Sequence, residues 1–368
     1  MRESKIRWHR MVIKKGAAGS GGPAAPGMTR SGVKCVGRER LGCMDDELRV
    51  AATCDIGGTK VLQGLVNESG VVFARERYLL GEQRDPQCIA EDMFARWRRL
   101  AHDSGLSWRQ VVGVGCSAAA MIDIERGVLL SAPNMFPGYE DVPFRDLLQR
   151  TTGLPSVVEM DAYAAAIGEF WQGAGVGVGY FVYVVVGTGI GAGILVDGEV
   201  FRGYRGTAGE LGHTTVLEGG PLCNCGRYGC LEALASGPAI VRRAEGALRQ
   251  GRGSSMVSAA DTGTLTPRVI FDAAHEGDRV AAGVVQATVG YLAAGLVNVL
   301  HVLNPEVIAL GGGVITGGED LLLRPLRQEV ADRCGSWIDR QGIRIVMASL
   351  GEDASLVGAA RLVFQRCG

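Results

Sequence analysis

One local pattern occurs twice in this chain and limits the folds that the sequence can adopt. An apolar strand, a glycine turn and a second apolar strand run through CDIGGTKVLQGLV from Cys54 and again through VVGTGIGAGILV from Val185, about 130 residues later. Each copy is typical of a buried β-hairpin, because β-branched residues favour strands and glycines permit tight turns. A chain that uses this unit twice is predicted to form two similar α/β lobes that face each other.

Strand and helix periodicity continues this pattern along the chain. Apolar runs alternate with longer stretches of helical spacing from about Arg49 onward, as in an α/β protein. The first expected strand is 49–58, which ends in a glycine turn, and two more lie within 60–78 around a turn at 68–70. The others are 111–116, 155–160, 180–200 as a hairpin, 306–313 and 343–348. The expected helices cover residues 85–101, 161–174, 236–249, 267–275, 281–303, 319–334 and 354–364.

The first 49 residues differ in composition from everything that follows. They begin with a basic stretch and continue into the low-complexity run GAAGSGGPAAPG over residues 16–27. Such a segment cannot bury enough apolar surface to order itself, so a flexible tail is expected. Met28 and Met44 also offer later start positions, and a basic tail that grips nucleic acid is the alternative.

The segment HTTVLEGGPLCNCGRYGCLE, residues 213–232, carries a metal-binding pattern. His213, Cys223, Cys225 and Cys230 form an H-x9-C-x-C-x4-C array. One imidazole and three thiolates suit a closed tetrahedral zinc site of the structural kind. The loop is rich in glycine and poor in apolar side chains, so burial alone cannot order it. A structural zinc contributes on the order of 10 kcal/mol to such ordering; two disulfides or unrelated core cysteines are the alternative.

Charge and cysteine usage limit the class of protein. A net charge of −1 gives no general attraction to nucleic acid or to a membrane surface. No apolar run is expected to reach the roughly 20 residues of a membrane span, and the first 30 residues lack the apolar core of a secretory signal. The pattern therefore predicts a cytoplasmic protein with reduced thiols. The cysteines outside the metal array show no paired spacing: Cys35, Cys43, Cys54, Cys88, Cys116, Cys334 and Cys367.

Three glycine turns, each at the end of an apolar strand, predict a nucleotide site. Glycines let the backbone approach a ligand, and successive N–H groups form a concavity for phosphate oxygens. Asp55 at a strand end can hold Mg²⁺ through water. Neither GxxxxGK[ST] nor a strand-GxGxxG-helix unit is present, which excludes P-loop and Rossmann sites. The expected nucleotide contacts are Asp55, Gly57, Gly58, Thr59, Lys60, Gly187, Thr188, Gly189, Gly312 and Gly313.

Five motifs together resemble the ROK family of sugar kinases and related repressors. They are D-I-G-G-T-K at 55–60, G-T-G-I-G at 187–191, G-E-L-G-H at 209–213, C-x-C-G-x-x-G-C-x-E at 223–232 and G-G-G at 311–313. The resemblance covers roughly residues 50–365. It implies a two-lobed actin/hexokinase/Hsp70-like ATPase (ribonuclease H-like) fold with a structural zinc loop. The expected lobes are residues 50–160 plus 351–368, and residues 161–350, after a tail over 1–49.

The same resemblance implies roles for the polar residues of the site. Asp161 matches the family's catalytic base, which accepts the proton of a primary hydroxyl as that hydroxyl attacks the γ-phosphoryl group of ATP. Asn134, Glu210, His213 and Glu232 match positions that bind sugar hydroxyls. A metal-bound imidazole keeps its second nitrogen as a donor, so His213 can serve both zinc and sugar. The alternative for Asp161 is a simple first-turn acid of the helix that follows.

Two departures from the family pattern concern the acceptor. The family usually has Asn before the catalytic Asp, where this chain has Met160, a side chain with little hydrogen-bonding capacity. The family's G-x-P-G-P turn is replaced by Cys116–Met121, CSAAAM, in a loop expected after the strand 111–116. Both changes favour a less polar pocket. A C7 cyclitol of the valiolone type is therefore the alternative to glucose or an N-acetylhexosamine.

Non-catalytic members of the same family are the remaining alternatives. Family repressors carry a helix-turn-helix segment before the kinase-like region, and the Gly/Pro-rich residues 1–49 contain no expected recognition helix. A sugar sensor without turnover is disfavoured because Asp55, Asp161 and Glu210 are all present. The sequence thus predicts an ATP- and Mg²⁺-dependent kinase of a sugar or cyclitol. The resemblance also implies a homodimer, with no nucleic-acid or membrane partner.

Overall fold

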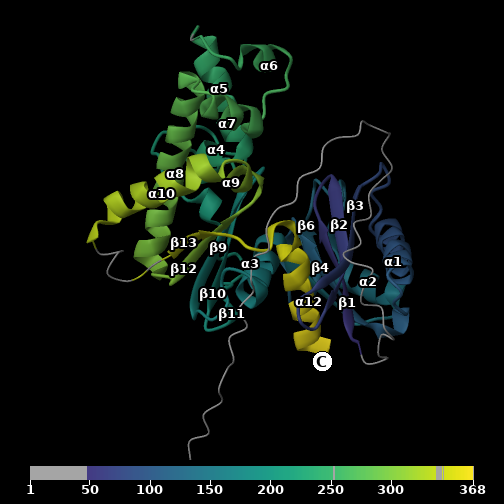
Figure 1. Cartoon of the computed structure of the whole chain (residues 1–368). Helices are drawn as coiled ribbons and strands as arrows, with labels where there is room; N and C mark the ends of the chain where they lie inside the picture. The colour runs from purple at the N-terminus through teal and green to yellow at the C-terminus, as the bar shows by residue number, and fades with distance from the viewer. Residues whose placement is uncertain (1–47, 252, 337–341, 343, 368) are drawn as a thin grey trace, which may run out of the picture. The chain divides into compact units, whose positions relative to one another are not determined.

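The computed structural model describes residues 48–251, 253–336, 342 and 344–367. The tail expected over residues 1–49 lies outside these ranges except for its last two residues. Two mixed five-stranded sheets dominate the described chain (Figure 1).

The first sheet has the strand order β3-β2-β1-β4-β8. Its three leading strands form an antiparallel meander, and β4 and β8 then add in parallel to β1. Parallel strands need crossover connections, and these are supplied by helices and by a separate three-stranded sheet. The bounds are β1 Val50–Ile56, β2 Lys60–Asn67, β3 Val72–Leu79, β4 Val111–Ala118 and β8 Ser156–Met160.

The second sheet repeats the pairing pattern of the first. Its order is β11-β10-β9-β12-β13, in which β9, β10 and β11 are antiparallel while β12 and β13 run parallel to β9. The duplicated hairpin that the sequence predicts is thus present as β1–β2 and β9–β10. The bounds are β9 Tyr180–Val186, β10 Ile190–Val196, β11 Glu199–Val200, β12 Val307–Gly311 and β13 Arg344–Met347.

The main helices lie where the periodicity predicts them, and α7 and α10 match the expected bounds. The helices are α1 Pro86–Asp103, α2 Phe144–Thr152, α3 Asp161–Gln172, α4 Leu231–Ala235, α5 Gly237–Arg249, α6 Val257–Asp261, α7 Pro267–His275, α8 Arg279–Leu303, α9 Gly313–Gly317, α10 Glu319–Cys334 and α12 Ala354–Cys367. The elements not predicted are short: α2, α4, α6, α9 and a three-stranded sheet of β5 Met121–Asp123, β6 Val128–Ser131 and β7 Glu140–Val142.

Helix α8 corrects one expectation about apolar runs. It has 25 residues and a mean hydropathy of 1.7, so by length and composition alone it could cross a membrane. No other helix among the described residues passes this test. More than half of its most apolar 18-residue stretch is buried, in the hydrophobic core that also contains residues of the second sheet. A fully apolar helix is expected where neighbours cover it on several sides, which is the case here.

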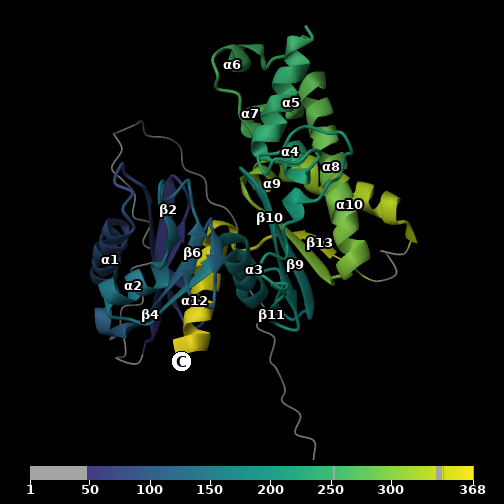
Figure 2. The same ribbon diagram turned by 180° about the vertical axis from the view of Figure 1, so that it is seen from behind.

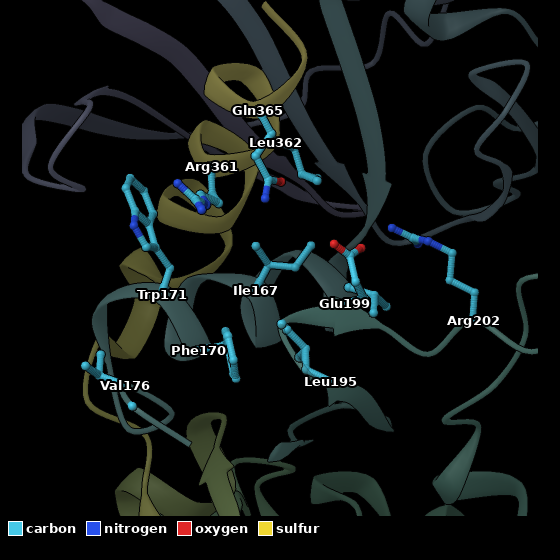
Figure 3. A pocket seen from close by; sticks show the side chains of 13 residues that line it. Ile167, Phe170, Trp171, Val176, Leu195, Glu199, Arg202, Arg361, Leu362 and Gln365 are labelled. Carbon is cyan, nitrogen blue, oxygen red and sulfur yellow. The ribbon is translucent and has the colours of Figure 1, made fainter. Parts of the chain in front are cut away.

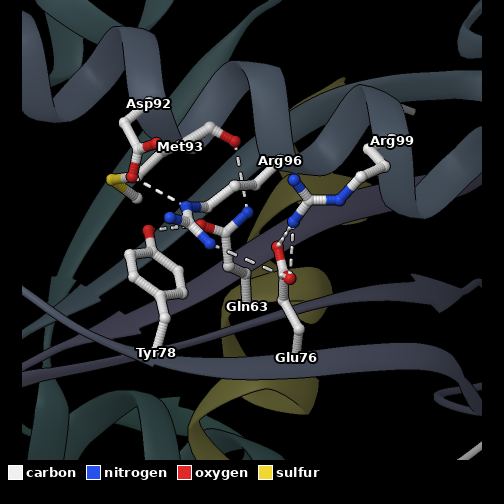
Figure 4. Close-up of polar contacts among 7 residues, drawn as sticks. All are labelled: Gln63, Glu76, Tyr78, Asp92, Met93, Arg96 and Arg99. Atoms are coloured by element: carbon white, nitrogen blue, oxygen red, sulfur yellow. Dashed lines mark hydrogen bonds and ion pairs between the residues drawn. The ribbon is translucent and has the colours of Figure 1, made fainter. Parts of the chain in front are cut away.

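A polar network fastens α1 to the outer strands of the first sheet (Figure 4). The buried Gln63 donates from its side-chain nitrogen to the Met93 carbonyl at 3.1 Å and accepts from the Tyr78 hydroxyl at 2.6 Å. The guanidinium of Arg96 stacks over the Tyr78 ring at 3.8 Å and pairs with Asp92. Every buried polar group in this contact therefore has a partner, as a stable packing of a helix on a sheet requires.

Helices α3 and α12 pack against each other, and each also covers one of the two sheets. Helix α12 contacts β1 and β4 of the first sheet, while α3 contacts β9 and β10 of the second. Both views of the ribbon show the pair side by side between the sheets (Figures 1 and 2). A Cβ atom at Gly358 would lie 1.7 Å from the Ala164 carbonyl oxygen, and one at Gly168 would lie 2.1 Å from the Ala354 carbonyl oxygen. Glycine is therefore required at both contacts.

A buried carboxylate holds the strand-to-helix connection that leads into α12. Glu169 of α3 is 0 % exposed and accepts hydrogen bonds from the backbone N–H groups of Ala174, Ser349 and Leu350 at 2.7–2.9 Å. Hydrogen bonds to a charged group contribute more than neutral ones, and an unpaired buried carboxylate would be strongly destabilising. Glu169 therefore fixes where the chain passes from β13 back to the first sheet.

Replacing Gly358 with Ala should destabilise the fold strongly, because the new methyl group would overlap the Ala164 carbonyl. The expected loss in free energy of unfolding is at least about 3 kcal/mol, in the range of severe overpacking. Chemical denaturation monitored by circular dichroism would measure it. Gly246→Ala in α5 is the control: its nearest heavy atom is 3.9 Å away, so the change should be neutral or stabilise by about 0.5–1 kcal/mol. Equal effects at the two sites would contradict this account of the helix contact.

Candidate active site and zinc loop

The three predicted glycine turns meet at one cavity of about 880 Å³. The β12 strand ends at Gly311, and Gly312 follows with a φ of +90° against the end of β9, where a Cβ would lie 2.3 Å from the Val186 carbonyl oxygen. Only glycine fits that position. The predicted nucleotide residues that line the cavity are Asp55, Gly57, Gly58, Thr59, Lys60, Thr188, Gly312 and Gly313. Gly187 and Gly189 flank Thr188 without lining it.

Asp55 lies at the carboxyl end of β1, where the parallel strands β1 and β4 end together. The Ser117 hydroxyl of β4 donates to its Oδ1 at 2.8 Å. Burial raises the pKa of Asp55, while the Ser117 hydrogen bond and the charge of Arg77 oppose that shift. A buried carboxylate that is held through Oδ1 in this way is suited to a hydrated cation.

Asp161 is the first residue of α3 and lines the same cavity. Its Oδ1 accepts the backbone N–H of Ala162 at 2.8 Å. The pKa of Asp161 is raised to about 6, chiefly by burial and also by the charges of Asp55 and Glu210, against the Ala162 hydrogen bond. This residue is therefore a first-turn acid, as the simpler alternative holds, and also a carboxylate whose pKa is brought toward neutrality. Pairs of carboxylates with perturbed pKa values are typical of catalytic sites.

The four predicted acceptor residues come from separate elements, and none of them lines this cavity. Asn134 is exposed in the segment before β7 and contacts the first glycine turn, since a Cβ at Gly58 would lie 2.7 Å from the Cβ of Asn134. Glu210 is close enough to Asp161 to raise the pKa of that residue. His213 has its Nε2 atom 4.0 Å from Oε2 of Glu210.

Glu232 lies beside the second glycine turn and already has a backbone partner. Its Oε2 accepts the N–H of Ile190, the first residue of β10, at 2.9 Å. Its Oε1 lies 3.9 Å from the Cys223 sulfur. Glu232 and Thr188 also line a smaller cavity of about 280 Å³ next to the cysteines. The carboxylate thus connects the second glycine turn to the loop that carries the cysteines.

The four predicted zinc ligands lie together. The Nδ1 atom of His213 and the sulfurs of Cys223, Cys225 and Cys230 are all within 4.8 Å of one another. The Nδ1 of His213 lies 3.7 Å from the Cys223 sulfur, and the sulfurs of Cys225 and Cys230 are 3.6 Å apart. A bond length of about 2.3 Å to tetrahedral zinc places two thiolates about 3.8 Å apart. The donor set and its spacing fit zinc, and the cysteines are free thiols.

The orientation of His213 agrees with a double role. Its Nδ1 faces the cysteine sulfurs, while its Nε2 points toward Glu210. A ligand imidazole commonly donates its second N–H to a carboxylate, which fixes the ring. Zinc would supply only structural order here, because three thiolates and one imidazole leave no open position for a reacting group.

The expected loop after Cys116 is shorter than predicted. Strand β4 continues through Ser117 and Ala118, and β5 begins at Met121, so only Ala119 and Ala120 form the turn. Ladder pairing accounts for the difference: Ser117 pairs with Asp55 on one side and with Glu159 on the other. Without the prolines and glycine of the family turn, nothing interrupts these hydrogen bonds.

Several residues at the site escaped prediction because nothing in their local sequence marks them. Ser117, which holds Asp55, is one. Arg77 of β3 lines the large cavity and pairs with Glu352 at 2.5 Å. Glu159 and Arg202 form a third case, a pair beside Met160 in which only the carboxylate is buried. An acid in an otherwise apolar strand, as in SVVEM, was the one available signal for Glu159.

Comparison with known proteins gives the family. The ROK family model matches residues 51–366. The chain belongs to the ROK family. A glucokinase of Halalkalibacterium halodurans is 34 % identical over 85 % of this chain and 94 % of its own length. A xylose repressor of Caldicellulosiruptor bescii is 34 % identical, over 69 % of this chain and 62 % of the repressor.

Solved ROK structures share the architecture described above. The structure of a ROK family glucokinase from Streptomyces griseus in complex with glucose and AMPPNP has a TM-score of 0.69 and 33 % identity, covering 86 % of this chain and 99 % of that one. The predicted fold class is therefore confirmed: an α/β ROK fold with the two mixed sheets of actin-like ATPases, together with a His/Cys cluster consistent with zinc.

Purified protein should carry about one zinc per chain, and Cys225→Ser should remove most of it. Cys225 is exposed, so the substitution removes a ligand with little change in packing. A lost ligand weakens binding by a factor of at least about 100 and lowers the thermal midpoint, because metal binding stabilises the folded loop. Inductively coupled plasma mass spectrometry and thermal unfolding with and without a chelator would measure both. Cys88→Ser, at an exposed cysteine in α1, is the control and should retain full zinc.

Proposed function

We propose that this ROK protein is an ATP- and Mg²⁺-dependent kinase that phosphorylates the primary hydroxyl of a hexose such as glucose. The observation that carries the proposal is Asp161. Its carboxylate is buried at the wall of the cavity formed by the glycine turns, with a pKa of about 6. A base is most effective when its pKa lies near the working pH. The glucokinase relatives support the same activity.

ATP is proposed to occupy the cavity across the three turns. Its volume of about 880 Å³ suits a nucleotide. Backbone N–H groups of residues 58–60 and the Lys60 side chain would receive the phosphates, and residues 311–313 would lie beneath the base. A Mg²⁺ ion held through water by Asp55 would neutralise phosphate charge. Relief of the repulsion between Asp55 and Asp161 would accompany its binding.

The chemical step then uses Asp161 as general base. The acceptor hydroxyl oxygen forms a bond to the γ-phosphorus, while the bond from that phosphorus to the β–γ bridging oxygen breaks and ADP leaves. The hydroxyl proton passes to the Asp161 carboxylate. Because phosphoryl transfer depends mainly on positioning and charge neutralisation, the surrounding residues contribute chiefly by orienting the acceptor. In this proposal Asn134, Glu210, His213 and Glu232 hold the sugar hydroxyls.

Met160 is the reason for a second candidate acceptor, a valiolone-type C7 cyclitol. The Met160 side chain packs against the core of the first sheet's half, next to Asp161. It offers no hydrogen bond to a ring hydroxyl. An acceptor with a carbocyclic ring and an exocyclic CH2OH would fit this less polar edge. Hexoses remain the first choice because the glucokinases match this chain over most of their length.

A repressor or sensor is the remaining alternative, and turnover separates it from a kinase. The xylose repressor matches this chain over 62 % of the repressor's own length, whereas the glucokinase matches it over 94 % of the glucokinase's length. A cytoplasmic homodimer completes the proposal. Seven of the described cysteines are free thiols, in keeping with a reducing compartment, and sedimentation equilibrium would measure the oligomeric state.

Asp161→Asn should abolish phosphorylation while leaving ATP binding intact. The loss expected is at least about 100-fold in kcat, because an amide cannot accept the hydroxyl proton. A coupled ADP-release assay on glucose, N-acetylglucosamine, N-acetylmannosamine, glucosamine and valiolone would measure it. The kcat of the wild type should fall as the pH drops through about 6, where the carboxyl becomes protonated. ATP binding without turnover of any acceptor would overturn the kinase proposal.

The same variant should be more stable than the wild type at high pH. The pKa of Asp161 is raised in the folded state, so the wild type loses stability as the pH rises through about 6. Asparagine keeps the Ala162 hydrogen bond without the charge. The difference in free energy of unfolding should be small below pH 4 and reach about 1–3 kcal/mol at pH 8. Urea denaturation of both proteins at the two pH values would measure this. If the pKa of Asp161 were not raised, the difference in free energy of unfolding between variant and wild type would be the same at both pH values.

Met160→Asn should improve the use of glucose by restoring an amide beside the base. A new hydrogen bond to a ring hydroxyl would lower the KM for glucose by about 10-fold. The KM for valiolone should not fall. Met160→Leu is the control, since leucine keeps the apolar packing and adds no hydrogen bond. Steady-state kinetics on both acceptors would test it, and an unchanged glucose KM in Met160→Asn would show that residue 160 does not read the acceptor.

A further inference from the structure

An ion pair between a buried carboxylate and a half-buried guanidinium lies directly beside the proposed base. Glu159, the residue before Met160 in β8, is 1 % exposed. The guanidinium of Arg202 donates to both of its oxygens, at 3.0 and 2.6 Å. Glu159 Oε1 also accepts the N–H of Met160 at 2.9 Å. Such a two-pronged contact fixes both the position and the orientation of the carboxylate, and with it the backbone at the start of α3.

Arg202 belongs to a different part of the chain, the loop after β11. Its guanidinium stacks over the Tyr163 ring at 5.4 Å. The Tyr163 hydroxyl donates to the carbonyl oxygens of Ala208 at 2.5 Å and Gly206 at 3.3 Å. The Ala208 N–H in turn donates to the Arg202 carbonyl at 3.0 Å. These bonds close the loop over residues 202–208 on itself and fasten it to α3.

This loop leads straight into the proposed acceptor residues. The carbonyl of Gly209 accepts the N–H of Ala192 in β10 at 3.0 Å, which fixes the end of the loop on the second sheet. Glu210 follows at once, and His213 lies three residues later. The Glu159–Arg202 pair therefore connects the strand that ends at Asp161 with the segment that carries Glu210 and His213.

We propose that Glu159 and Arg202 are positioning residues for phosphoryl transfer. The pair sets the distance between the Asp161 carboxylate and the Glu210–His213 segment, so that the acceptor hydroxyl meets the base and the γ-phosphate in line. The proposal rests on the kinase activity proposed above. A displacement of about 1 Å in such a site lowers a rate by about 100-fold. Neither residue lines the large cavity, so both act through other groups.

A further cavity beside Arg202 leaves space into which its side chain could move without Glu159. Arg202 lines a space of about 400 Å³ between α3, the β10–β11 hairpin and α12 (Figure 3). Ile167 and Leu195 form its apolar walls, and Arg361 stacks on Trp171 at another side. A guanidinium that loses its bidentate partner has room to turn into this space. The loop over residues 202–208 would then lose its register against α3.

Arg202→Lys tests the proposal because lysine keeps the positive charge and loses the planar fork. The expected result is a decrease in kcat of about 10- to 100-fold, with a KM for ATP within about two-fold of the wild type and unchanged zinc content. Arg243→Lys is the matched control. Arg243 also stacks on a tyrosine, Tyr291 at 5.1 Å, and donates to Thr288 and Leu234, but it lies among helices α4, α5 and α8. Its kcat should not change.

Hydrogen–deuterium exchange supplies a readout that does not require turnover. Amide protection over residues 203–213 should fall in Arg202→Lys and in Glu159→Gln, and stay unchanged in Arg243→Lys. If the wild type turns over no acceptor, the kinase proposal fails while exchange still decides whether the pair orders the loop. Equal kcat losses in Arg202→Lys and Arg243→Lys, or wild-type protection in Arg202→Lys, would overturn the positioning role.

Discussion

The close contact between α3 and α12 is the constraint on which the rest of this structure depends. Carbonyl oxygens of one helix occupy the places where side chains of the other would stand, at Gly168 and Gly358. Each helix also packs on a different sheet, so the contact fixes the two sheets relative to each other. Because α3 begins at Asp161, the same contact sets where the proposed base lies.

Buried carboxylates surround this crossing, and each has a different environment. Glu169 is satisfied by three backbone N–H groups and fixes the entry into α12. Glu159 is satisfied by Arg202. Asp55 and Asp161 are only partly satisfied, and burial raises the pKa of each. Glu159 and Glu169 therefore stabilise the fold. The charged forms of Asp55 and Asp161 are less well stabilised, and both residues line the cavity proposed to bind charged phosphates.

The zinc loop extends this arrangement to the acceptor side. Its four ligands bring His213 next to Glu210 and hold Glu232 beside the second glycine turn. A segment with so few apolar side chains has no core of its own, so a metal bound to this cluster would replace burial as the source of order. The acceptor roles of these residues stay predictions, because Glu210, His213 and Glu232 do not line the large cavity.

Much of the fold could be predicted from local sequence patterns. The hairpins at Cys54 and Val185, the helices α7 and α10 and the H-x9-C-x-C-x4-C array were all predictable, because turn chemistry, helical spacing and ligand spacing act over short distances. Short elements such as β5–β7 were missed, since three or four residues carry too little periodicity. The continuation of β4 through Ala118 was missed because ladder pairing with neighbouring strands decides it.

The sequence by itself thus determined the duplicated sheet units and the candidate zinc ligands, which depend on residue types at short spacing. Its resemblance to the ROK family implied the candidate base, Asp161. Only the tertiary structure decided which of these groups interact. The Ser117 bond to Asp55, the pairing of Glu159 with Arg202 and the effect of the Asp55 charge on the pKa of Asp161 join residues up to 106 positions apart. Burial and Coulomb interactions act through space, so their partners cannot be read from neighbours along the chain.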